Sequence, residues 1–339
     1  MANDVKKVAI NGFGRIGRTA FRAAYDQKAK IKIVALNDLT DPATLAYLLR
    51  HDSVYGNWKG HEVKSTKDSI IVDGEKITVY AEKDPVNLPW GKLGIDVVIE
   101  STGFFTDKEG AAKHITAGAK AVVISAPTKS KDLNTYVIGA NADKIKKGEQ
   151  IISNASCTTN CTAPVISILN NAFGVKKALL TTVHAYTATQ KLVDGPDPKD
   201  PRRGRAAAAN MAPSTTGAAI ATTLTIPELK GMFDGVAIRV PVIAGSMIDV
   251  TALLKKKVTV EQVNEAFVKA SKNPLWKGII KVSDEPLVSS DILGTSYSAI
   301  IEPEFTKVID GDLVKVLAWY DNEYGYSMRL IDMVELVKT

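Results

Sequence analysis

The chain has 339 residues, a length typical of two domains, and its 45% hydrophobic and 24% charged residues are ordinary for a globular protein. The net charge of +6 indicates a mildly basic surface, with a field that favours anionic ligands as the alternative, and the basic clusters at 201–205 and 255–257 are too short for a nucleic-acid surface. Two cysteines exclude a disulfide framework, and no apolar run is long enough to span a bilayer. Because the first residues lack a signal-peptide pattern, we expect a cytoplasmic protein with no membrane or nucleic-acid partner.

The first half of the chain alternates predicted strands with predicted helices. A strand at Lys7 to Asn11 precedes a helix with an apolar face at 16–24. The further elements are strands at Ile31 to Leu36, Ile95 to Glu100, Ala121 to Ser125 and Ile151 to Ser153, with a helix at Asp107 to Ala117. This alternation predicts an α/β domain with a doubly wound parallel sheet over residues 1–156.

The second half is richer in long strands and predicts an α+β domain with a mixed sheet over residues 157–321. Its strands are predicted at Lys177 to Tyr186, Val236 to Val242, Met247 to Leu254 and Leu313 to Tyr320, with a helix at Val260 to Ser271. The last helix, at Tyr326 to Val337, is amphipathic. We expect the segment 322–339 to pack back on the first domain.

A glycine motif, Gly12-Phe13-Gly14-Arg15-Ile16-Gly17, lies between the first strand and the first helix and matches G-x-G-x-x-G. Gly12 allows the tight turn, Gly14 allows the backbone to approach a pyrophosphate, and Gly17 allows close helix–strand packing. Asp38 ends the second strand, where its carboxylate can accept bonds from ribose hydroxyls and repel a 2′-phosphate. The unit therefore predicts a Rossmann-type NAD site; a ligand-free glycine turn and a capping role for Asp38 are the alternatives.

Cys157 precedes a predicted helix at Thr158 to Asn171, in which Pro164 is tolerable only near the start. The helix N-terminus is expected to lower the pKa of the Cys157 thiol and to hold an oxyanion. His184, at the end of an apolar strand, is the best candidate base, because His51, His61 and His114 lie in polar or helical segments without chemical neighbours. An inert thiol and a structural histidine are the alternatives. Cys161 is expected to be a packing residue, and no metal site is expected.

Over essentially its whole length, the chain resembles the phosphorylating glyceraldehyde-3-phosphate dehydrogenase family. The resemblance rests on Ile10 to Arg18, Ser101-Thr102-Gly103, Ser153 to Cys161, Thr182 to Thr187 and Trp319 to Ser327. The segment Ala155 to Cys161 is highly specific to this family.

The resemblance implies a role for each matching residue. Cys157 is implied as the nucleophile and His184 as its activating partner. Thr187 and Arg239 are implied for the phosphate of the substrate, with Arg203 near the phosphates, and Ser156, Thr158, Thr216 and Gly217 for inorganic phosphate. Arg15, Ile16, Asp38, Ser125 and Asn322 are implied as NAD contacts.

The implied reaction is the NAD-dependent oxidative phosphorylation of glyceraldehyde 3-phosphate to 1,3-bisphosphoglycerate, in glycolysis and gluconeogenesis. It would proceed through a hemithioacetal and a thioester on Cys157, in a homotetramer. Erythrose-4-phosphate dehydrogenase and a non-catalytic NAD-binding protein are the alternatives.

Two positions and one segment depart from common family patterns. Ile220 stands where many members carry lysine, and Thr189 where several bacterial members carry aspartate. Val242 to Ser246 replaces a frequent Thr-Pro-Asn-Val-Ser. These departures bear on loops, interfaces and the surroundings of the phosphate sites more than on the thiol.

Overall fold

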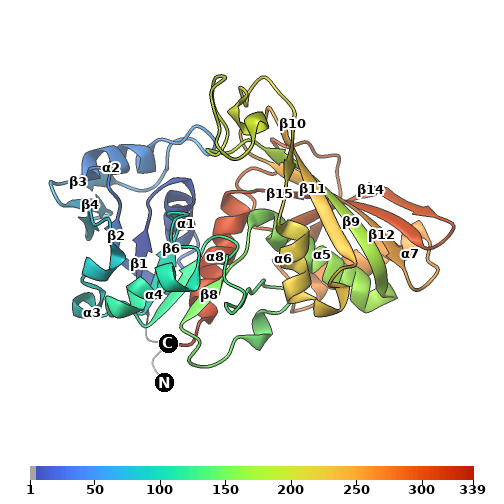
Figure 1. The fold of residues 1–339 in the computed structure, drawn as a ribbon, viewed down its shortest axis with the longest axis horizontal. Helices are drawn as coiled ribbons and strands as arrows, with labels where there is room; N and C mark the ends of the chain where they lie inside the picture. The colour runs from blue at the N-terminus through green and yellow to red at the C-terminus, as the bar shows by residue number, and fades with distance from the viewer. Residues whose placement is uncertain (1–4) are drawn as a thin grey trace. The chain divides into compact units, whose positions relative to one another are not determined.

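A computed structural model describes residues 5–339, which form two compact units. Unit 1 comprises the chain up to Tyr136 together with Asp143–Ala155 and Ser327–Thr339. Unit 2 comprises Val137–Ala142 and Ser156–Tyr326. Figure 1 follows the chain through both units in colour. Among the described residues, no helix is both long and apolar enough to cross a membrane.

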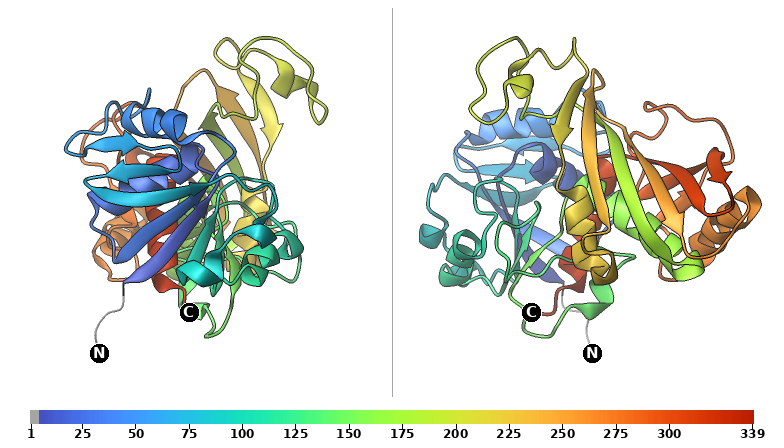
Figure 2. Two further views of the ribbon diagram at one scale, coloured as in Figure 1. Left: turned by 90° about the vertical axis from the view of Figure 1, so that its left-hand side faces the viewer. Right: turned by 45° about the vertical axis from the view of Figure 1, so that its right-hand side comes forward.

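Unit 1 is built on one eight-stranded sheet with the order β3-β4-β5-β2-β1-β6-β7-β8. The left view of Figure 2 faces this unit. Its strands are β1 (Lys6–Asn11), β2 (Ile31–Asn37), β3 (Val63–Ser65), β4 (Ser69–Val72), β5 (Glu75–Tyr80), β6 (Val97–Glu100), β7 (Ala121–Ile124) and β8 (Ile151–Ser153). Its helices are α1 (Arg15–Asp26), α2 (Pro42–Arg50), α3 (Trp90–Leu93) and α4 (Lys108–Thr116).

The sheet of unit 1 is parallel at its centre and antiparallel at one edge. The β2-β1-β6-β7-β8 strands pair in parallel, as the sequence predicts, and β5 also pairs in parallel with β2. The predicted doubly wound parallel sheet is therefore confirmed, and an edge that the sequence did not predict is added to it, in which β3 pairs antiparallel with β4 and β4 with β5. Only a short turn at Asp73 and Gly74 joins β4 to β5, and such a turn cannot make the crossover that a parallel pair requires.

The last helix, α8 (Tyr324–Leu336), is tied to the first strand within unit 1. Lys6 Nζ donates to the carbonyls of Val334 at 3.0 Å and Glu335 at 2.7 Å, and also to Val337. A cation at these terminal carbonyls satisfies backbone acceptors that the helix leaves without partners.

Unit 2 is built on a seven-stranded mixed sheet with the order β10-β11-β9-β12-β15-β14-β13. The right view of Figure 2 shows its long strands side by side. The strands are β9 (Val175–Ala185), β10 (Ala212–Thr215), β11 (Phe233–Val240), β12 (Ser246–Leu254), β13 (Ile280–Val282), β14 (Ala299–Ile309) and β15 (Leu313–Tyr320). Its helices are α5 (Cys157–Phe173), α6 (Ala218–Thr225) and α7 (Val260–Lys272).

Helix α5 forms the centre of the core of unit 2. Its middle turns are buried among apolar side chains from the strands and from α6 and α7. Pro164 is its eighth residue, so the expectation that proline would be tolerable only near the start is wrong. The proline removes one backbone hydrogen bond, but burial of residues on most sides of the helix stabilises it without that bond.

Candidate active site

A cavity of about 520 Å³ lies in unit 1 at the carboxyl ends of β1, β2 and β6. These strands are neighbours in the order β2-β1-β6. The chain adds β2 on one side of β1 and returns to add β6 on the other side, so the strand order reverses at β1. Open α/β sheets bind ligands at such a switch point. Of the predicted cofactor residues, Gly12, Gly14 and Asp38 line the cavity.

The glycines fit a dinucleotide. Gly12 has φ +90°, and a Cβ there would lie 2.7 Å from Thr102 N. A Cβ on Gly17 would lie 2.2 Å from Gly12 O, whereas a Cβ on Gly14 would meet nothing within 4 Å. Helix α1 starts after Gly14, and no side chain caps it. Its first backbone N–H groups are therefore not bonded to a capping side chain. This combination accommodates a pyrophosphate against the backbone.

Asp38 is fixed at the cavity by its own backbone surroundings. Its Oδ2 accepts from Phe13 N at 2.8 Å and its Oδ1 from Thr40 N at 2.9 Å.

Three predicted cofactor residues, Arg15, Ile16 and Ser125, are not among the residues that line the cavity. Arg15 instead pairs with Asp52 at 2.5 Å, and Ser125 N donates to Glu100 O.

Replacing Gly17 with alanine is expected to lower the free energy of unfolding by about 2 kcal/mol or more, because backbone rather than a movable side chain blocks the new Cβ. Gly14→Ala is the matched control. We expect it to unfold like the native chain, yet to bind NAD at least about tenfold more weakly, because its Cβ projects where the pyrophosphate approaches. Urea unfolding and NAD titration by fluorescence separate the two effects. Equal stability of the two variants would contradict the packing role of Gly17.

Cys157 and His184 meet within unit 2. Cys157 is the first residue of α5, and Ser156 caps that helix by accepting from Thr159 N at 3.1 Å. His184 lies near the end of β9 and is 4% exposed. Its Nε2 lies 3.4 Å from Cys157 Sγ. This is hydrogen-bond distance for a sulfur pair, as a nucleophile and its base require.

Arg239 supports the histidine from the neighbouring strand. It stands opposite His184 in the parallel β9–β11 register. Arg239 Nη1 lies 2.6 Å from His184 Nδ1, while Nδ1 is 2.7 Å from the Ala185 carbonyl oxygen. A proton on Nδ1 bonds to that carbonyl and leaves Nε2 as an acceptor; a proton on Nε2 leaves Nδ1 to accept from Arg239. The two tautomers therefore compete.

The electrostatics of the pair differ from the prediction. Burial, together with the charge of Arg239, lowers the pKa of His184 from 6.5 to about 3. Burial raises the pKa of the Cys157 thiol, although Arg239 and hydrogen bonds from Thr158 act in the opposite direction. The expectation of a lowered thiol pKa is thus wrong, because desolvation outweighs the helix N-terminus. At neutral pH both groups are uncharged, so the thiol still carries the proton that the imidazole would accept.

Tyr320 and Ser246 are site residues to which the sequence assigned no role. Tyr320 OH bonds to Thr158 Oγ1 at 2.8 Å and Thr182 Oγ1 at 2.9 Å, and its ring packs edge-on against His184. Ser246 Oγ bonds to Asn322 Oδ1 at 2.9 Å, which orients that predicted cofactor residue. The resemblance at Trp319 to Ser327 includes Tyr320, but only the fold shows its partners.

Ser156 and Thr158 lie at the start of α5, and the other predicted phosphate residues fall into two groups in unit 2. Arg203 and Arg239 converge, with Thr189 and Ser214, on one small cavity. Thr187 Oγ1 bonds to Thr189 Oγ1 at 2.9 Å at the edge of this region. Thr216 and Gly217 lie between β10 and α6, where the hydroxyl of Thr216 accepts from Ala218 N. Three arginines, Arg202, Arg203 and Arg239, line this cavity, and guanidinium groups suit a phosphate.

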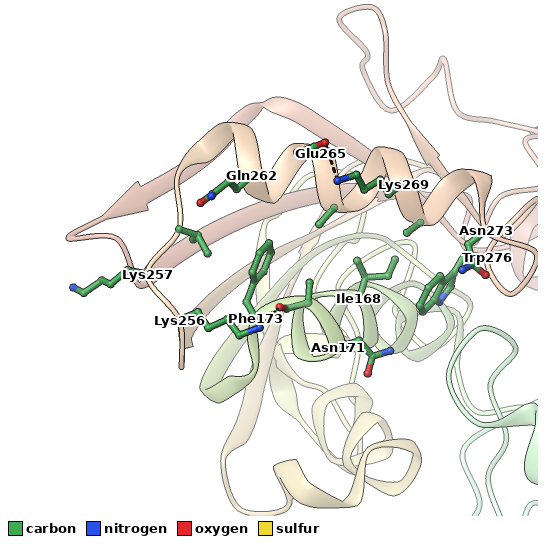
Figure 3. A pocket seen from close by; sticks show the side chains of 14 residues that line it. Ile168, Asn171, Phe173, Lys256, Lys257, Gln262, Glu265, Lys269, Asn273 and Trp276 are labelled. Atoms are coloured by element: carbon green, nitrogen blue, oxygen red, sulfur yellow. Dashed lines mark hydrogen bonds and ion pairs between the residues drawn. The ribbon is translucent and has the colours of Figure 1, made fainter.

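Another cavity, of about 540 Å³, lies between α5 and α7 and is lined by none of the predicted site residues (Figure 3). Its floor is apolar, with Ile168 and Phe173 on α5. Its three lysines have partners: Lys256 donates to Ala172 O, Lys269 pairs with Glu265, and Lys257 pairs with Asp310. The cavity therefore presents no group suited to the chemistry of a thiol enzyme.

Two family models match the chain. The C-terminal domain of glyceraldehyde 3-phosphate dehydrogenase matches residues 156–322, and the NAD binding domain of the same family matches residues 6–108. Curated relatives named glyceraldehyde-3-phosphate dehydrogenase from Streptomyces coelicolor and Geobacillus stearothermophilus are each 52% identical over 98% of both chains. Glyceraldehyde-3-phosphate dehydrogenase 1 of Kluyveromyces lactis is 50% identical, also over 98% of both chains. The chain belongs to the glyceraldehyde-3-phosphate dehydrogenase family, and its cofactor is NAD.

Proposed function

We propose that the protein converts glyceraldehyde 3-phosphate, NAD and inorganic phosphate into 1,3-bisphosphoglycerate and NADH, as the glycolytic enzyme of this family. Unit 1 is assigned to NAD and unit 2 to the chemistry. The observation that carries the proposal is the 3.4 Å contact between Cys157 Sγ and His184 Nε2 beside the arginine Arg239. A nucleophile that forms a covalent acyl intermediate needs a thiol and a base within hydrogen-bond reach, as this pair is.

The first half of the reaction is addition of the thiol to the aldehyde. His184 Nε2 takes the Cys157 proton, the sulfur bonds to the aldehyde carbon, and the proton passes to the new alkoxide to give a hemithioacetal. His184 then removes that hydroxyl proton as the carbon loses a hydride, which leaves a thioester on Cys157. NAD, when bound, supplies the hydride acceptor.

The second half is attack of inorganic phosphate on the thioester carbon, which breaks the carbon–sulfur bond and releases the acyl phosphate. The Cys157 thiolate that leaves takes back the proton held by His184, which restores the starting pair. Ser156, Thr158, Thr216 and Gly217 are assigned to this phosphate. Thr187, Arg239 and Arg203 are assigned to the phosphate that the substrate already carries. An anion that engages Arg239 also removes its competition for His184 Nδ1, which favours the tautomer with Nε2 free to act as the base.

The test is NADH formation from glyceraldehyde 3-phosphate and NAD, with and without phosphate or arsenate, and with erythrose 4-phosphate as a second substrate. Strong activity that requires the oxyanion supports the proposal. Oxyanion-independent turnover of erythrose 4-phosphate would assign the alternative dehydrogenase, and NAD binding without turnover would assign a non-catalytic protein.

The assembly is proposed to be a homotetramer. Adjacent strands of unit 2 expose Leu179 (65%) and Val236 (53%), and the loops between β9 and β12 expose further apolar side chains at Leu192, Val193, Met211 and Ile243. Large exposed apolar patches mark interfaces, so the exposure of these side chains supports the proposal. Light scattering is expected to give four times the 36.4 kDa chain mass.

We also place the protein in the cytoplasm. Both cysteines are free, and a thiol nucleophile at Cys157 must remain reduced. Reductant-dependent activity in the isolated enzyme would support this assignment.

A further inference from the structure

A buried carboxylate, Glu100, lies behind the NAD cavity of unit 1. It ends β6 and is 1% exposed. One oxygen accepts from the backbone N–H of Thr102 at 2.8 Å and from its hydroxyl at 2.5 Å. The other accepts from Asn11 Nδ2 at 2.6 Å and lies 3.0 Å from His114 Nε2. Four donors fill the four acceptor positions of an ionised carboxylate.

His114 is a fixed donor in this arrangement. It lies on α4, is fully buried, and its Nδ1 lies 3.0 Å from Trp90 Nε1. The indole N–H can only donate, so Nδ1 must accept and the single imidazole proton must sit on Nε2, facing Glu100. This corrects the expectation that His114 has no chemical neighbours. The pair is a neutral histidine donating to an anion, held in one tautomer by the tryptophan.

The hydrogen bonds continue from Glu100 around the wall of the cavity. Asn11 Oδ1 accepts from Asn37 Nδ2 at 2.7 Å, and Asn37 Oδ1 accepts from Glu82 N at 2.8 Å. Asn11, Asn37, Glu82 and Thr102 all line the cavity, whereas Glu100, His114 and Trp90 do not. Asn11, Asn37 and Glu100 each end one of the adjacent strands β1, β2 and β6. One buried carboxylate thus binds two wall residues directly, Asn11 and Thr102, and is linked through Asn11 to Asn37 and Glu82.

We propose that Glu100, oriented by His114 and Trp90, is the positioning residue of the NAD site, which fixes the cavity wall before the cofactor binds. The proposal rests on the assignment of this cavity to NAD. Hydrogen bonds that already hold the wall side chains in place reduce the conformational entropy that these side chains would otherwise lose when NAD binds. None of the four hydrogen-bond donors to Glu100 is a cation. Burial of the ionised carboxylate therefore costs free energy unless all four donors are in place.

Glu100→Gln is the direct test. Glutamine keeps the shape but presents two N–H donors, which must face either the donors of Thr102 or those of Asn11 and His114. We expect the dissociation constant of NAD to rise roughly tenfold or more, while kcat at saturating NAD stays within a few-fold of the native value. His61→Gln is the matched control, because His61 also bonds to a carboxylate of unit 1, Asp73 at 2.6 Å, yet does not line the cavity. We expect it to leave NAD affinity unchanged.

Trp90→Phe gives a second, independent readout that does not depend on a change at the carboxylate. Nitrogen NMR of the native protein is expected to show the His114 proton on Nε2, and the variant is expected to lose that single tautomer and to bind NAD a few-fold more weakly. If the native chain failed to bind NAD, the cofactor assignment itself would fail. If the native chain binds NAD and both folded variants bind it within twofold of native, the positioning role of Glu100 is overturned.

Discussion

Replacing Cys157 with serine is expected to reduce turnover by about 10³-fold or more while NAD binding persists. The oxygen replaces the sulfur at nearly the same place, so His184 Nε2 and Arg239 stay in position. A hydroxyl gives up its proton far less readily than a thiol, and burial, which already raises the pKa of the Cys157 thiol, penalises an alkoxide further. Steady-state NADH formation measures the loss, and NAD titration tests whether unit 1 is intact.

Cys161→Ala is the matched control for the cysteine replacement. Cys161 lies one helical turn away, is fully buried and packs in the apolar core of unit 2. Its truncation is expected to cost about 1 kcal/mol of stability and to leave turnover near the native level. Iodoacetamide is expected to abolish activity in both the native chain and this control. Normal turnover by Cys157→Ser would rule out the thiol as nucleophile.

The fold was largely predictable where local pattern and tertiary burial agree. The strand–glycine–helix unit at residues 7–36 carries its own turn chemistry, so β1, α1 and β2 match the prediction closely. The strands at 63–80 escaped prediction because they are short, lie at a sheet edge, and alternate polar with apolar residues only over a few positions. Their antiparallel pairing depends on tight turns rather than on the periodicity of any one segment.

The sequence made Cys157 and His184 candidates by residue type and position, with an inert thiol and a structural histidine as alternatives, and the fold places the two side chains 3.4 Å apart. The direction of the thiol pKa shift was not predictable, because it depends on how deeply the fold buries the thiol. Tyr320 and Thr158 are 162 positions apart and meet only because β15 and α5 pack in one core. His114 likewise acquires its partners from β6 and α3, which no local pattern reveals.

His184→Asn is the second large expected effect, with kcat lowered about 10²- to 10⁴-fold, because His184 Nε2 is the base that lies 3.4 Å from the Cys157 sulfur, and Thr158, which also bonds to the thiol, is not basic. Asparagine preserves a polar side chain between the Ala185 carbonyl and Arg239 but is not basic at neutral pH. The substrate phosphate residues are untouched, so the KM for glyceraldehyde 3-phosphate is expected to change less than kcat. A variant that retains native kcat would remove His184 from the mechanism and leave the 3.4 Å contact as packing.

The same replacement is expected to change how stability depends on pH. The folded chain holds the pKa of His184 at about 3, whereas the unfolded chain has the ordinary value of 6.5. Above pH 6.5 neither state binds the proton, so this group adds no pH dependence. Between pH 6.5 and about 3 the unfolded state binds it alone, and the folded state loses about 1.4 kcal/mol per pH unit.

At pH 5 the loss from His184 amounts to roughly 2 kcal/mol, which His184→Asn should not suffer. Urea unfolding of both proteins at equal concentration, from pH 7.5 to pH 4.5, measures the difference in slope. The carboxylates contribute equally to the two curves, so the difference isolates the buried imidazole. Parallel curves would mean that His184 takes up its proton in the folded state, and then the neutral thiol–imidazole pair on which the proton-transfer step depends would not exist at mildly acidic pH.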